Sequence, residues 1–256
     1  VGFDAGNDVT TGTNNTLIGG LAGDALTTAT DNVAVGKSAL SADTKGTFTV
    51  AVGANALASQ NQTTATTTYN VAVGYDAGGA VTTGVQNTLI GGLAGDALTD
   101  ADFNVAVGLN ALTSDTLGSK STALGHGALN SQNFTTATDT FNVAVGMRAG
   151  FNVTTGVQNT LMGGQAGDAL TSGNSNVAVG MSALGSDTLG DRNVAVGHSA
   201  LNAQNFTTTT DVYNVAVGYD AGGDISTGKQ NTLVGGEAGD SITTGNNNVA
   251  IGYLAL

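Results

Sequence analysis

The chain has 256 residues, 40 glycines, no proline, no cysteine, and a formal net charge of −13 from 19 acidic and 6 basic residues. No disulfide can form, and we expect no nucleic acid partner, because the chain has no basic stripe to neutralise phosphates. No apolar run approaches the roughly 20 residues that span a bilayer, so we expect no membrane contact in this segment.

One short motif, which we call the rung, recurs along the whole chain: Asn70-Val71-Ala72-Val73-Gly74 is an example. Each rung glycine has an alanine three positions later. The rung glycines follow one another in steps of 17, 17, 17 and 21 residues, which together make a 72-residue repeat. They are Gly2, Gly19, Gly36, Gly53, Gly74, Gly91, Gly108, Gly125, Gly146, Gly163, Gly180, Gly197, Gly218, Gly235 and Gly252. Such regularity indicates one structural unit stacked many times.

The 72-residue repeat holds four successive coils. The first runs from Gly2 into a Thr-Thr-Gly turn, and the second has Thr16 and Leu17 where most rungs have Val and Ala. The third returns to Val-Ala-Val and carries Asp43, and the fourth has four extra residues after Gln60. The repeat spans residues 2–73, 74–145 and 146–217 and part of it spans 218–256, so we expect one repetitive segment over 1–256, cut from a longer protein.

The rung pattern predicts a β-strand. Alternation places Val71 and Val73 on one face and Ala72 on the other, and we expect Val73 to enter a dry stack between coils. Helices are not expected, because so short a coil cannot hold two helices and a linker. The first rung residue, which is Asn in all complete rungs except those of Thr49 and Ser121, predicts a column of stacked asparagines that bonds the turn backbone.

These patterns predict an all-β protein, a parallel β-solenoid (β-roll) of about 15 stacked coils of 17 or 21 residues. A rise of about 4.8 Å per coil gives a rod and sets the four-residue expansions about 19 Å apart. Each coil offers few apolar residues, so a lone column would expose an apolar flank. We therefore expect several chains to associate side by side.

The rung Asn-Val-Ala-Val-Gly-x-x-Ala-Leu, as at 104–112 and 193–201, resembles the repeat of the β-roll heads of trimeric autotransporter adhesins. It is also similar to the arrays of phage tail fibres, and the resemblance covers all fifteen coils. Adhesin heads typically use somewhat shorter coils, and neither a chaperone domain nor a membrane anchor is in this segment. The resemblance implies a homotrimer in an extracellular fibre.

The four-residue expansions hold the residues that we predict to contact a partner, a host or target-cell glycan or protein. Phe134 and Phe206 are expected at the loop tips, with Tyr69, Phe141 and Tyr213 where the loops return. Both the tip rings and the return rings could instead hold each loop on the solenoid. Flat rings beside amides and hydroxyls suit such ligands. The candidate contact residues are Gln60, Asn61, Gln62, Gln132, Asn133, Phe134, Gln204, Asn205 and Phe206.

No catalytic, cofactor or metal site is predicted. Asp4, Asp24 and Asp43 fall at different offsets from their rung glycines, so their repeats do not stack into one calcium-binding column. His126 and His198 are 72 residues apart, too far for a catalytic pair within one chain.

The sequence thus favours a structural and adhesive fibre shaft of a phage tail fibre, which would contribute to host attachment. The head or stalk of a bacterial trimeric surface adhesin is the alternative. An ice-binding solenoid is a third possibility, and it would need a flat array of Thr-x-Thr on one face.

Overall fold

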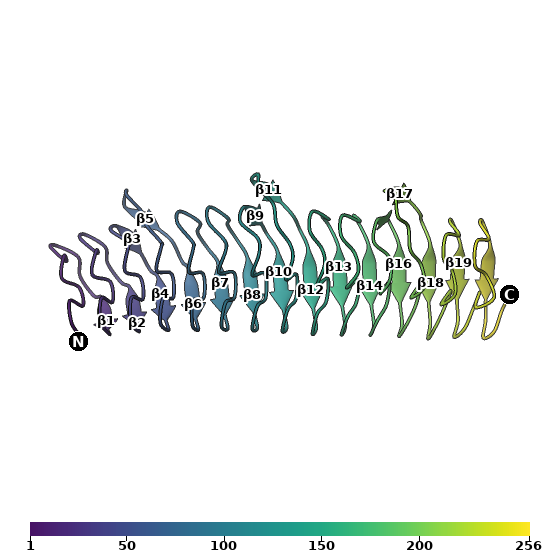
Figure 1. Ribbon diagram of the computed structural model, residues 1–256, viewed down its shortest axis with the longest axis horizontal. Helices are drawn as coiled ribbons and strands as arrows, with labels where there is room; N and C mark the ends of the chain where they lie inside the picture. Colours follow the sequence, from purple (N-terminus) through teal and green to yellow (C-terminus); the bar gives the residue numbers. More distant parts are fainter. The chain divides into compact units, whose positions relative to one another are not determined.

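The computed structural model describes all 256 residues, which form two compact units: residues 1–121 with 133–139, and residues 122–132 with 140–256. No helix is present, so none could span a membrane. Within each unit, three-residue strands lie side by side and run parallel (Figure 1). The predicted all-β parallel solenoid of stacked coils is confirmed, whereas the single segment over 1–256 stays a prediction.

Each rung contributes one strand. The first unit has β1 (Thr16–Ile18), β2 (Val33–Val35), β4 (Val50–Val52), β6 (Val71–Val73), β7 (Thr88–Ile90) and β8 (Val105–Val107). The second has β10 (Thr122–Leu124), β12 (Val143–Val145), β13 (Thr160–Met162), β14 (Val177–Val179), β16 (Val194–Val196), β18 (Val215–Val217), β19 (Thr232–Val234) and β20 (Val249–Ile251).

Two-residue strands form where a fourth coil stacks on a third. The first unit contains β3 (Gly46–Thr47), β5 (Thr66–Thr67), β9 (Gly118–Ser119) and β11 (Thr138–Asp139), and the second contains β15 (Gly190–Asp191) and β17 (Thr210–Asp211). β3 pairs with β5, β9 with β11, and β15 with β17. These pairs lie at the upper edge in Figure 1, opposite the edge toward which the three-residue strands point.

Both ends of a three-residue strand are fixed by left-handed backbone. Gly74 after β6 has φ 144°, and a Cβ there would collide with the Gly91 carbonyl oxygen. Tyr69, two residues before β6, has φ 50°. Strands pair without any shift, for example Val71 with Thr88, Ala72 with Leu89 and Val73 with Ile90. Residues at equal offsets from the rung glycine therefore stack on one another from coil to coil.

The core is a thin layer of alanine and leucine inside the coils. Ala72 and Leu89 are fully buried, whereas Val73 is 36% exposed. The expectation that Val73 enters a dry stack is therefore wrong, because the middle strand residue faces inward and the flanking valines face outward. The interior around Leu89 is filled: a Cβ added at Gly78 or Gly95 would stand 2.6 or 2.8 Å from its methyl groups.

Candidate functional site

Each fourth coil is anchored by a buried aspartate of the coil before it. Asp43 Oδ1 accepts hydrogen bonds from the backbone N–H groups of Gly46 (3.1 Å) and Gln62 (3.0 Å), and Oδ2 accepts one from Gln60 Nε2 (2.6 Å). Gln60 Oε1 in turn accepts a hydrogen bond from Asn70 Nδ2 at 2.8 Å. All the side chains of this network are buried. The start of the expansion is therefore tied into the core.

The same network recurs in the later repeats. Asp187 Oδ1 accepts from the backbone N–H groups of Gly190 (3.1 Å) and Phe206 (3.0 Å), and Oδ2 accepts from Gln204 Nε2 (2.6 Å). Asp115 Oδ1 accepts from the N–H groups of Gly118 and Phe134 at 3.1 and 3.0 Å. Sequence reasoning treated these aspartates only as possible metal ligands. The glutamine follows each of them at a constant spacing of one coil, and that spacing was the signal of an anchor.

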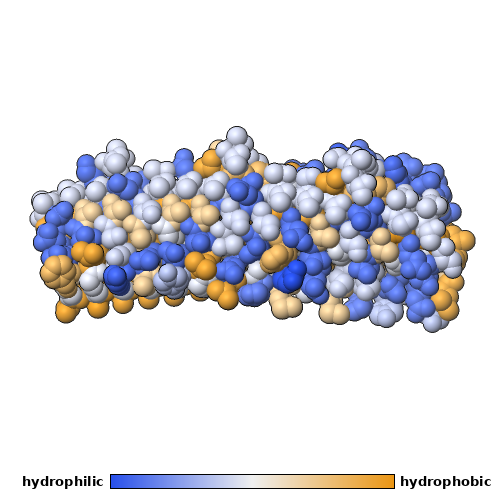
Figure 2. Space-filling view, in the orientation of Figure 1, coloured by the Kyte–Doolittle hydropathy of each residue, from blue (hydrophilic) through white to orange (hydrophobic).

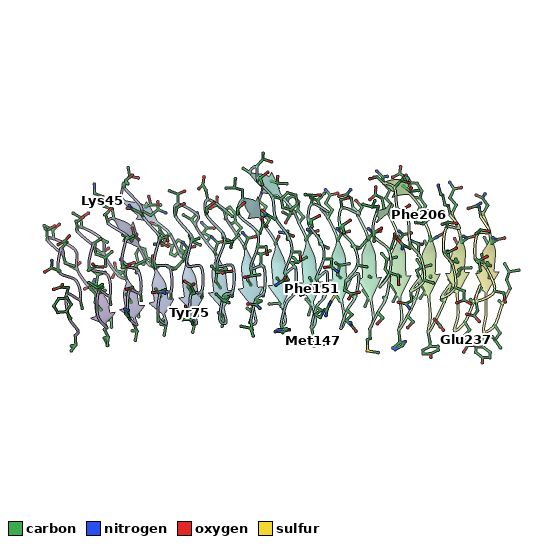
Figure 3. All side chains as sticks on the ribbon, in the orientation of Figure 1. Lys45, Tyr75, Met147, Phe151, Phe206 and Glu237 are labelled. Atoms are coloured by element: carbon green, nitrogen blue, oxygen red, sulfur yellow. The ribbon has the colours of Figure 1, made fainter.

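Six of the nine predicted contact residues are buried: Gln60, Gln62, Gln132, Phe134, Gln204 and Phe206. Phe134 is 8% exposed and Phe206 is 6% exposed, so the expectation that they stand at loop tips is wrong. Their backbone N–H groups bond the buried aspartate, which turns the rings inward. Lys229 lies against the Phe206 ring, with Nζ 5.6 Å from the centroid, and Figure 3 labels Phe206 beside β17.

Asn61, Asn133 and Asn205 are the three predicted contact residues that are exposed. Their Oδ1 atoms accept hydrogen bonds from the hydroxyls of Thr44, Thr116 and Thr188 at 3.3, 3.3 and 3.1 Å. The threonine-rich residues that follow, such as Thr63 and Thr64, are exposed as well. A role of the loops in contact with a partner stays a prediction that these residues alone could carry.

The return aromatics are the exposed rings of this region. Tyr69, Phe141 and Tyr213 are 56%, 51% and 48% exposed. Tyr69 lies against Phe48, with ring centroids 5.7 Å apart, and Arg192 lies over the Tyr213 ring at 5.6 Å. Both tyrosines thus contact the preceding coil and keep about half of their surface in solvent. That arrangement is compatible with both roles that the sequence left open.

The asparagine column has the predicted role. Asn70 Oδ1 accepts the backbone N–H of Asn87 at 2.9 Å, and Asn87 Oδ1 accepts that of Asn104 at 2.9 Å. The Nδ2 group of Asn70 donates to the Gly84 carbonyl at 2.8 Å. Each buried amide is thus satisfied on both sides, and the prediction of stacked asparagines bonding the turn backbone is confirmed.

A second polar column was missed from the sequence. It lies eight residues after each rung glycine and is Thr in most coils. Thr82 Oγ1 donates to the Thr99 carbonyl at 3.3 Å, and Thr99 Oγ1 donates to the Thr116 carbonyl at 3.0 Å. The constant offset from the rung glycine could have identified it. Asn61, Asn133 and Asn205 occupy this position in the fourth coils.

Carboxylates gather in pairs on neighbouring coils, without forming a metal site. No three His, Asp or Glu side chains come together as a metal ion would need. Burial raises the pKa of Asp96, and the charge of Asp76 raises it further, while a hydrogen bond from Thr113 lowers it. In the next repeat burial raises the pKa of Asp168. Arg148 Nη2 lies 4.0 Å from Asp168 Oδ2, and its positive charge partly offsets that rise.

The two histidines lie exposed in the second unit, each just after a rung glycine. His198 stacks on Tyr219, with ring centroids 5.4 Å apart, and its Nδ1 lies 2.9 Å from Ser199 Oγ. The pKa of Asp220 is raised by burial and by the charges of Asp240 and Asp224, and lowered by His198. The structure contains no pocket.

The outward strand face carries a regular row of apolar residues. The third strand residue, which we call the outer column, is apolar in every rung: Ile18, Val35, Val52, Val73, Ile90 and Val107 in the first unit, and Leu124, Val145, Met162, Val179, Val196, Val217, Val234 and Ile251 in the second. Figure 2 shows hydrophobic residues in a row along the edge where the strands of the first unit end. The predicted apolar flank is therefore present.

No protein family, curated protein or solved structure matches the chain.

Proposed function

We propose that the chain is a structural and adhesive fibre shaft, that three copies associate side by side, and that the fibre is a phage tail fibre. The outer column is the observation that supports this most. Its residues are apolar on every rung, while the surface elsewhere is rich in Thr, Asn, Ser and Gly. A continuous apolar strip on a soluble surface marks an interaction site.

The partner that best fits the outer column is another copy of the same chain. Successive rungs pair without any shift, so the outward side chains repeat at the coil rise of about 4.8 Å. A second copy has the same rise and the same apolar residues, so rung can match rung over the whole contact. The number three comes from the resemblance to trimeric fibres, as does the assignment to a tail fibre.

Ice binding is less well supported by the same face. Only the first strand residue is Thr, and mainly in second coils, as at Thr16 and Thr88, while the third is apolar. The regular Thr column eight residues after the rung glycine uses its hydroxyls to bond the next coil. Neither surface offers a free Thr-x-Thr array.

Sedimentation equilibrium tests the association. We expect the wild-type chain to have the mass of three copies. The variant Val52→Lys, Val73→Lys, Ile90→Lys should associate at least about tenfold more weakly, because it places charges in an apolar contact. Its charge-matched control is Thr63→Lys, Thr64→Lys, Thr67→Lys, at exposed positions off the three-residue strands, which should associate as the wild type does. A folded wild-type monomer would contradict the proposal.

The place where the chain is found distinguishes a phage tail fibre from a bacterial surface adhesin. An antibody against the chain, followed by electron microscopy, should label projections of phage particles. Labelling of bacterial surfaces in phage-free cultures would instead favour the adhesin.

A further inference from the structure

The residue just before the first residue of each rung forms a column that we call the corner column. Every member has left-handed φ, from 50° at Tyr69 to 64° at Lys120. The backbone is pinned there: the N–H of Gln86 donates to the Thr68 carbonyl at 2.7 Å, and that of Phe103 to the Val85 carbonyl at 3.1 Å. In the first unit the members are Asn14, Asp31, Phe48, Tyr69, Gln86, Phe103 and Lys120, and in the second Phe141, Gln158, Ser175, Arg192, Tyr213, Gln230 and Asn247. Side chains of this column therefore project from a fixed frame, one per coil.

The aromatic members occupy a position whose backbone favours other residues. Left-handed φ suits Asn and Asp, and Asn14, Asp31 and Asn247 use it in this way, whereas a bulky ring there is disfavoured. Phe48, Tyr69 and Phe103 nevertheless stand in it, with about half of each ring in solvent. Buried leucines such as Leu40 and Leu57 adopt the same left-handed φ, so this conformation belongs to the path of the coil. The exposure of the rings is what distinguishes the aromatic members of the corner column.

In the corner column, each aromatic residue of a fourth coil is followed one coil later by an exposed glutamine. Gln86, Gln158 and Gln230 stand one coil after Tyr69, Phe141 and Tyr213, and all three glutamines are exposed. The coil rise puts ring and amide about 4.8 Å apart along the column. Within the first unit this gives the series Phe48, Tyr69, Gln86 and Phe103, in which the first two rings are 5.7 Å apart and tilted by 30°. The Gln86 carboxamide makes no hydrogen bond within the chain, whereas Gln158 Oε1 accepts one from Ser175 Oγ at 3.3 Å and keeps its donor group, Nε2, for a ligand.

We propose that the aromatic and glutamine members of the corner column bind an uncharged, extended saccharide chain. A ring offers a flat apolar surface for the C–H face of a sugar, and a free carboxamide can donate to and accept from its hydroxyls. Arg192 and Lys120 are paired with Asp211 and Asp139, and the net charge of −13 disfavours an acidic glycan.

This inference rests on the proposed adhesive function and names the class of its partner. The test variant is Tyr69→Asn, Phe141→Asn, Tyr213→Asn, which removes three rings and supplies a residue that the column already holds at the same φ. The control, Tyr75→Asn, Tyr219→Asn, Tyr253→Asn, removes three exposed rings that follow the strands instead of preceding them. Figure 3 labels Tyr75 at that edge.

Binding is measured on an array of neutral and acidic oligosaccharides, with calorimetry on the strongest neutral hit. We expect the wild-type chain to bind a neutral glycan, the test variant to bind it about tenfold or more weakly, and the control to bind unchanged. Equal binding by the test variant, or wild-type binding to no neutral glycan, would overturn the inference. Sedimentation of the same samples tests the proposed association independently. If glycan binding is lost while association stays intact, the result concerns the corner column alone.

Discussion

At the scale of single residues, the partly buried carboxyl of Asp96 makes stability depend on pH. Burial raises the pKa of Asp96 above its ordinary value of 3.8, so the folded chain holds this proton more tightly than the unfolded chain does. Stability is therefore lost as the pH rises from the ordinary value through the raised pKa, and the loss persists at neutral pH. The Thr113 hydroxyl, which donates to Asp96, limits the effect.

We predict that Asp96→Asn raises the melting temperature at pH 7 and that the gain shrinks at about pH 3, where the carboxyl is protonated in both states. An amide oxygen can still accept the Thr113 hydrogen bond. Calorimetry at the two pH values measures the difference. Asp8→Asn is the control, since it removes one negative charge at an exposed position. A gain that is equal at both pH values would show that removal of the buried charge is not its cause.

The strand faces show how much of the burial pattern could be predicted from residue types. Alternation separated Val71 and Val73 from Ala72, as the structure bears out. The valine face was expected to be the inner face because valine is more apolar than alanine, and that choice was wrong. The second coils held the better signal: Thr88 stands at a valine position and Leu89 at the alanine position. A hydroxyl belongs outside and a leucine inside, so the alanine face had to be the core.

At the scale of the coil, period and parallel stacking were predictable, but the course of the fourth coil was not. The 21-residue step indicated four extra residues, and the pairing of β3 with β5 shows where they leave the shared path. Which side chains turn inward depends on Asp43, which lies 19 residues before Gln62 along the chain. A contact at that separation is set by the stacked backbone, so local composition could not identify the loop residues as buried.

The coil also has a defined minimum length. We predict that deleting Thr63–Thr66 together with Thr67→Gly leaves a folded chain, because Gln62-Gly-Thr68-Tyr69 then matches Lys45-Gly46-Thr47-Phe48 of the shorter third coil. Shortening a loop by four residues changes its closure entropy by well under about 1 kcal/mol. Circular dichroism and a thermal melt should stay close to those of the wild type.

Deleting only Thr64–Thr66 is the matched control for that experiment. It leaves a step one residue longer than the common one, which this chain uses nowhere. The corner column would then lose its register, and the melt should fall clearly below that of the four-residue deletion. Equal melting temperatures for the two deletions would mean that the loop tolerates any length and that the 17-residue step is not specially stable.

The four-residue deletion also tests which residues contact the glycan. Intact glycan binding by this variant would assign the contact to the corner column instead of the loop.

At the scale of the whole molecule, two surface properties oppose each other. The outer column favours association with other copies, since it is apolar on every rung. The net charge of −13 disfavours it, because each copy repels the next. The ion pairs Lys120–Asp139, Arg148–Asp168 and Arg192–Asp211 involve three of the 19 acidic residues, so few acidic groups have a basic partner. The strength of association is therefore set by how far this repulsion is screened.

This balance gives a prediction with a definite sign. Raising the ionic strength from about 0.01 M to about 0.15 M shortens the screening length from about 30 Å to about 8 Å. Repulsion between copies then weakens while apolar contact does not, so association of the wild-type chain should strengthen. Sedimentation equilibrium at the two salt concentrations measures it, with Val52→Lys, Val73→Lys, Ile90→Lys as the variant whose association should stay weak in both. If salt instead dissociated the wild-type assembly, complementary charges would hold the copies together, and the outer column would not be the contact.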